Sequence, residues 1–97
     1  MALSLILHHL SALEAEDEKR FFEAIFQIAP EHWQVSKTVT LAETGVSPAY
    51  LRDHLVRCLP PALRPETEIL VTHVSADAAW NALPAVGEQW VRDALAP

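Results

Sequence analysis

Histidine side chains are the groups in this sequence best suited to proton transfer or metal binding near neutral pH. Five are present: His8, His9, His32, His54 and His73. His9 and His73 each lie near the end of an apolar run. If these runs are neighbouring strands, the two imidazoles could lie side by side, with Glu14 or Asp77 completing a metal site or orienting a ring. This arrangement is one hypothesis for a small enzyme or metal protein.

The spacing of these residues matches no catalytic or metal-binding motif. There is no HExxH or His-x-His, and Cys58 is the only cysteine, which excludes a cysteine-rich zinc site. Ser11 and Ser75 lack a Gly-x-Ser-x-Gly setting and are better explained as helix caps. Gly45 and Gly87 are isolated, so no glycine-rich phosphate loop is predicted. We therefore assign no catalytic residue, no metal site and no cofactor.

Three apolar runs predict β-strands that would form the sheet. They are Leu3–Leu10, Trp33–Leu41 and Glu68–Val74. In Glu68–Val74, the mostly β-branched apolar residues suit a pleated, buried surface. Trp33–Leu41 alternates with period two, and Lys37 on its apolar side is typical of an edge strand. We expect Glu68–Val74 to be the central strand, between the other two.

Helix signals follow each predicted strand. Ser11 and Glu14 form a capping-box pattern ahead of a helix that ends near Pro30. A second helix is predicted from Ser47 and Pro48 to Leu59. Ser75 would cap a short third helix over Ala76–Leu83, and Pro84 either breaks it or opens another helical segment towards Leu95. The order is therefore strand-helix three times, which predicts a single α/β or α+β domain over residues 1–97 with a three-stranded sheet.

Composition narrows the classes of function. The chain of 97 residues is 51% hydrophobic and carries a formal net charge of −6, from 13 acidic and 7 basic side chains. The acidic balance argues against a nucleic-acid partner, because an acidic surface repels phosphate. The apolar run at Ala2–Leu10 is too short to span a bilayer, so we expect no membrane segment. The lone Cys58 fits a reducing compartment, which favours a cytoplasmic protein.

The tryptophans Trp33, Trp80 and Trp90 have two interpretations. They could all belong to the core, or one or two could form an apolar patch for a partner, since tryptophan is enriched at interface hot spots. The high apolar content for so small a chain favours some surface being covered by a partner.

A resemblance supports a different function. The segment contains Leu-Ala-Glu at 41–43, Gly-Val-Ser at 45–47, then Tyr50, Leu51 and Leu55, and it resembles the helix-turn-helix of many bacterial regulators. The resemblance implies a DNA-binding element over residues 40–59, in a winged helix-turn-helix fold. Its second helix would enter the major groove with Tyr50 and Arg52 at the bases and Arg57 near phosphates.

Our leading prediction is a small acidic protein-interaction module, non-catalytic, acting as a regulatory, inhibitory or adaptor subunit. Its partner would be another protein or a second copy of the chain. An aromatic anchor among Trp33, Trp80 and Trp90 would bind inside an acidic rim. The alternative is the DNA-binding regulator that uses Tyr50, Arg52 and Arg57, and the third hypothesis is the histidine-based enzyme or metal protein.

Overall fold

Four strands form one antiparallel sheet in the order β2-β3-β1-β4, in a computed structural model that describes residues 2–96. The elements are β1 (Ala2–His9), α1 (Ala15–Ile28), β2 (Glu31–Gln34), β3 (Val39–Thr44), α2 (Pro48–Arg57), the 3-10 turn η1 (Pro61–Leu63), β4 (Glu68–His73) and α3 (Ala85–Leu95). The expected mixture of helices and strands is therefore confirmed as an α+β domain. The predicted three-stranded sheet and its strand order are wrong.

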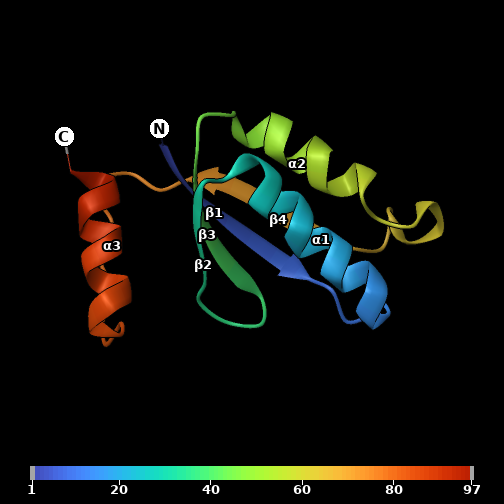
Figure 1. Ribbon diagram of the computed structural model, residues 1–97, viewed down its shortest axis with the longest axis horizontal. Coiled ribbons are helices and arrows are strands. Elements are labelled where there is room, and N and C mark those ends of the chain that lie inside the picture. The colour runs from blue at the N-terminus through green and yellow to red at the C-terminus, as the bar shows by residue number, and fades with distance from the viewer. Residues whose placement is uncertain (1, 97) are drawn as a thin grey trace.

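The sheet has helices on both faces. In Figure 1, α1 and α2 lie on one side of the sheet and α3 lies on the other. Side chains alternate along β1, as a strand requires. Ser4, Ile6 and His8 are buried on the face that packs on α1 and α2, which we call the inner face. Leu3, Leu5 and Leu7 point to the opposite face towards α3, which we call the outer face.

The predicted strand Trp33–Leu41 is a hairpin, and this supplies the fourth strand. The chain turns between β2 and β3, where the backbone N–H groups of Val35 and Ser36 donate to the Val39 carbonyl at 2.9 and 3.2 Å. Trp33 and Leu41 are opposite each other on the two strands. Since the turn preserves the alternation of odd and even positions, the period-two pattern continues across it and conceals the break. Lys37 is exposed in this turn and does not face inward from an edge strand.

The centre of the sheet is β1, and β4 is an edge strand. This corrects the prediction that Glu68–Val74 is central. The two strands do pair, but in antiparallel register, so that His9 lies opposite Glu68 while His73 lies opposite Ser4. His9 and His73 are therefore at opposite ends of the strand pair. The hypothesis that these imidazoles could lie side by side therefore fails, because antiparallel pairing separates residues that end their respective strands.

Two predicted helix starts are also wrong. Ser11 lies in a turn, in which the Leu13 N–H donates to the Leu10 carbonyl at 3.0 Å, and α1 begins after Glu14. Ala76–Leu83 is not helical: the Ser75 hydroxyl oxygen accepts from the Asp77 N–H at 3.3 Å in a turn. Serine side chains can form such turns with the backbone, and helical backbone is disfavoured for the residue that precedes Pro84. The helix α3 begins directly after Pro84, as the second interpretation of that proline predicts.

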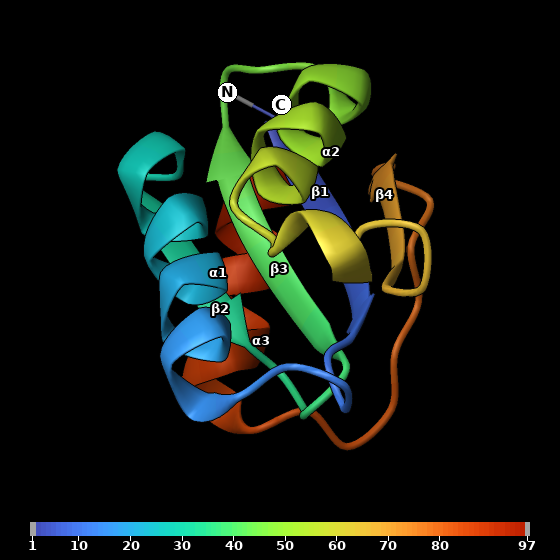
Figure 2. The same ribbon diagram turned by 90° about the vertical axis from the view of Figure 1, so that its right-hand side faces the viewer.

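The main core lies between the inner face and the helices α1 and α2, which cover that face in Figure 2. Ile6, Phe21, Ile25, Leu51 and Leu55 are completely buried there. They come from β1, α1 and α2, and Ala42 of β3 joins them, so the amphipathic stripes of the two helices pack on the sheet around β1.

His8 is a polar side chain inside this core. Its Nε2 is hydrogen bonded with the Thr40 hydroxyl at 2.8 Å, and its ring meets Phe21 and Phe22 edge-on at centroid distances of 5.5 and 5.3 Å. Burial lowers the pKa of His8 from its ordinary value of 6.5, more than the Glu18 carboxylate raises it. The folded protein therefore holds His8 as a neutral ring.

This predicts acid sensitivity near neutral pH. The unfolded chain takes up a proton at His8 near pH 6.5 and the folded chain takes it up only at lower pH, so the free energy of unfolding should fall as pH decreases through 6.5. The limit for one proton is about 1.4 kcal/mol per pH unit. Urea unfolding between about pH 7.5 and 5.5, above the usual titration of carboxylates, measures the slope. His8→Gln should flatten it, whereas His9→Gln, at the exposed neighbour, should not.

Candidate functional site

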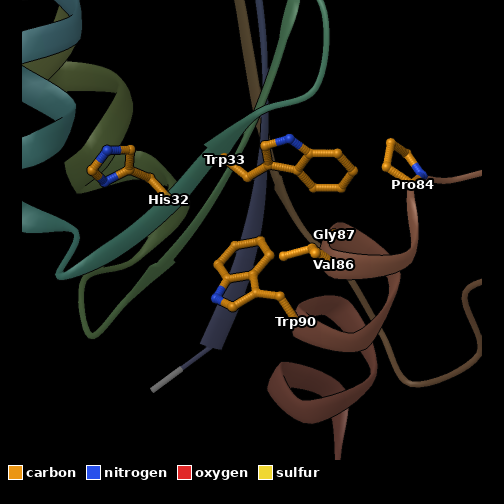
Figure 3. Close-up of a pocket in the computed structure, with 6 residues that line it drawn as sticks. All are labelled: His32, Trp33, Pro84, Val86, Gly87 and Trp90. Atoms are coloured by element: carbon orange, nitrogen blue, oxygen red, sulfur yellow. The ribbon is translucent and has the colours of Figure 1, made fainter.

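Two of the three tryptophans line one surface pocket. Figure 3 shows Trp33 projecting from β2 and Trp90 from α3 towards the same space. The cavity measures about 360 Å³, and we call it the tryptophan pocket. It is lined by His32, Trp33, Pro84, Val86, Gly87 and Trp90. Each tryptophan is half-buried, so part of each indole is available to a ligand.

Trp33 reaches the pocket because it occupies the outer face of β2, opposite Leu41 in the register. Gly87 then allows α3 to approach the indole closely. A Cβ atom at Gly87 would lie 2.7 Å from Trp33 Cζ2 and closer still to Cη2. No other residue type fits there without movement of Trp33 or α3.

Trp90 is positioned by two contacts of α3. The neighbouring Val91 is only 4% exposed and anchors the helix on the outer face of the sheet. The Trp90 indole Nε1–H donates to the Glu31 carboxylate Oε2 at 2.8 Å. The residues in contact come from β2 and α3, 59 positions apart in the chain. The Glu31 carboxylate does not itself line the pocket, but it is hydrogen bonded to Trp90, which does.

Negative charge accumulates beside the tryptophan pocket. Glu31 and Glu43 are directly opposite each other on β2 and β3, on the outer face. Within residues 2–96, the ion pairs join Arg20 to Asp17, Arg52 to Asp53 and Arg92 to Glu88. Neither Glu31 nor Glu43 is paired with a cation among these residues. Two carboxylates therefore occupy this part of the outer face with no cation of these residues beside them.

His32 contributes little polar chemistry to the pocket. Figure 3 shows its ring on the other side of β2 from Trp33, as expected for adjacent residues of a strand. The ring stacks on Phe26 with a centroid distance of 4.0 Å, and Nδ1 lies 3.5 Å from the Ala29 carbonyl. Its role is packing against α1.

Trp80 is separate from the other two tryptophans. It lies in the segment between β4 and α3, where the Arg92 guanidinium sits 5.1 Å above its ring. It lines a shallow hollow with Leu95 at the C-terminal part of α3. The structure thus divides the three candidate binding residues into a pair, Trp33 and Trp90, and a single residue.

The remaining histidines do not converge on one site. His9 is exposed in a hollow shared with Glu18 and Lys37. The His54 Nε2–H donates to the Ala24 carbonyl at 3.0 Å and so joins α2 to α1. In the described part of the chain, no group of three His, Cys, Asp or Glu side chains is placed to hold a metal ion.

The three residues predicted to contact DNA all belong to α2, and their side chains are exposed. Tyr50 is 53% exposed, Arg52 and Arg57 are exposed, and Arg52 pairs with Asp53 at 3.0 Å. The Ser47 cap is confirmed, since its hydroxyl oxygen accepts from the Tyr50 N–H at 3.1 Å.

The winged helix-turn-helix fold is wrong, because its first helix is replaced by a strand. Residues 39–44 form β3, in which Thr40, Ala42 and Thr44 are buried on the inner face. The Thr44 hydroxyl donates to the Ile28 carbonyl at 2.7 Å, which fixes this strand against the end of α1. The helix α2 therefore follows a strand and packs on a sheet.

Comparison with known proteins leaves the site to be interpreted from its own geometry. No protein-family model, curated protein sequence or solved structure matches the chain. The helices within residues 2–96 are all too short or too polar to cross a membrane.

Two residues of this site were not singled out from the sequence. Glu31 lies two positions before Trp33, and period two in a strand predicts that both share a face. That signal was present in the sequence. Gly87 carried no such signal, because its importance depends on which strand α3 packs against.

The close approach at Gly87 yields a stability test. Gly87→Ala gains up to about 1 kcal/mol of helix propensity. Overpacking against Trp33 should cost about 1–3 kcal/mol and leave the protein less stable overall. Urea unfolding measures the change, and near-UV circular dichroism reports the tryptophan surroundings. Gly45→Ala is the matched control, because a Cβ there meets no atom within 4 Å. Equal effects of the two substitutions would contradict the packing described.

Proposed function

We propose that this chain is a small acidic protein-interaction module that acts without catalysis, as a regulatory, inhibitory or adaptor subunit. It binds another protein through the tryptophan pocket. The observation that carries the proposal is the convergence of Trp33 and Trp90 on one surface cavity beside the Glu31 carboxylate.

The energetics of interfaces support this choice of surface. Binding energy concentrates in a few aromatic and arginine residues within well-packed pockets, surrounded by a polar rim. The tryptophan pocket has such a centre, with the exposed Val86 beside it and Glu31 next to Trp90. Trp33 packs closely against α3 at Gly87, and Trp90 is hydrogen bonded to Glu31. Because both indoles are already restrained, little side-chain entropy remains to be lost when a partner binds.

A second copy of the chain is the other partner considered. The outer face is not fully covered by α3, because Leu7 and Leu70 lie opposite each other on β1 and β4 and are 37% and 54% exposed. Light scattering on the purified protein distinguishes this case. The single thiol, Cys58, supports the cytoplasmic location that we propose for the module.

The proposal predicts which tryptophan matters. Affinity capture from the native host should recover a partner that survives purification as a defined complex by light scattering. Trp90→Ala should weaken that purified complex by about 30-fold or more, as expected for a hot-spot residue. Trp80→Ala removes the same side chain outside the tryptophan pocket and should leave the affinity within about twofold. Unfolding curves for both variants establish that each remains folded.

Two results would contradict the proposal. One is a complex whose affinity is unchanged by Trp90→Ala or by Trp33→Ala. The other is DNA binding that falls steeply with salt and is lost in Arg52→Ala and Arg57→Ala, which would assign the function to the exposed side of α2.

A further inference from the structure

Resting on the proposed function, we propose that the tryptophan pocket receives an arginine side chain from a basic segment of the partner protein. The guanidinium would lie against the indoles of Trp33 and Trp90 and pair with the Glu31 carboxylate. This assigns the chemistry of the partner, which the proposed function leaves open.

The first argument is the charge left unbalanced at the site. Glu31 and Glu43 face each other across β2 and β3, and no lysine, arginine or histidine of residues 2–96 pairs with either. A cation brought by the partner would be attracted to both carboxylates. The net charge of −6 also favours encounter with a basic surface.

The second argument is the combination of aromatic faces with a carboxylate. Tryptophan is the best aromatic partner for a cation. The guanidinium is planar, so it can stack on an indole while its N–H groups reach a carboxylate. Glu31 has hydrogen-bonding capacity to spare, since only Oε2 accepts from Trp90 Nε1. The ammonium of lysine offers no planar surface, which makes arginine the better occupant.

The third argument is that the site is already formed. The hydrogen bond from Trp90 to Glu31 fixes the Trp90 indole beside the carboxylate. The Trp33 indole packs closely against α3 at Gly87. The cavity of about 360 Å³ falls within the range of small ligand sites, roughly 300–1,000 Å³. An arginine side chain would therefore enter a pocket that needs little rearrangement.

The probe is a short Gly-Ser peptide with one central arginine, titrated into the full chain. Its matched control carries citrulline, which has the same shape without the charge. In nitrogen-15 NMR spectra, the indole N–H signals of Trp33 and Trp90 should shift with the arginine peptide, and that of Trp80 should not. The citrulline peptide should bind at least about fivefold more weakly. A lysine peptide should also bind more weakly than the arginine peptide.

The variant Glu31→Gln tests the carboxylate separately from the hydrogen bond, because a glutamine oxygen can still accept from Trp90 Nε1. It should weaken arginine binding about fivefold or more. Glu66→Gln, which makes the same change of net charge on the exposed loop before β4, should have no such effect. Raising the salt concentration should weaken the arginine peptide more than the citrulline peptide.

Several outcomes would overturn the arginine assignment. They are equal binding of the arginine and citrulline peptides, tighter binding of the lysine peptide, indifference to Glu31→Gln, and unshifted Trp33 and Trp90 signals at about 10 mM peptide, the weak limit for such a contact. If the captured partner is lost with Trp90→Ala but retained with Glu31→Gln, the proposed function stands and the arginine assignment fails. If the Trp90 substitution has no effect, the proposed function itself fails.

Discussion

The rest of the structure depends on β1 being paired at both edges and covered on both faces. Its even-numbered side chains complete the core with α1 and α2, and its odd-numbered side chains begin a second apolar layer. The outer face of β1 carries Leu3, Leu5 and Leu7, which could not be left fully in water without a large hydrophobic cost. The chain therefore needs α3, and the position of α3 creates the tryptophan pocket.

The two faces are covered to different degrees. The inner face meets two helices and buries ten residues in one continuous cluster. Among the helices of residues 2–96, α3 lies on the outer face, and Val91 is its one buried residue. A cover this small leaves space at the side of the helix, where Trp33 and Trp90 remain half-buried. The pocket is thus a consequence of one helix covering a four-stranded sheet.

Much of this fold was predictable, and the errors have physical causes. Apolar runs identified β1 and β4, and the cap at Ser47 located α2, because these signals are local. The β2-β3 hairpin was missed because Trp33 and Leu41 keep the same parity across the turn. The order of strands was missed because pairing is a long-range property, and no local signal distinguishes a central strand from an edge strand that is equally apolar.

For the candidate site too, local signals identified the residue types, whereas the long-range packing decided which of them lie together. Residue type identified Trp33 and Trp90 as candidates, but the same reasoning included Trp80, which the fold places elsewhere. Glu31 unites the site, because one carboxylate both orients Trp90 and opposes Glu43. An uncharged side chain could also have accepted the hydrogen bond from the indole N–H. The carboxylate instead places a negative charge beside two half-buried indoles, and this combination favours a cationic partner over a neutral one.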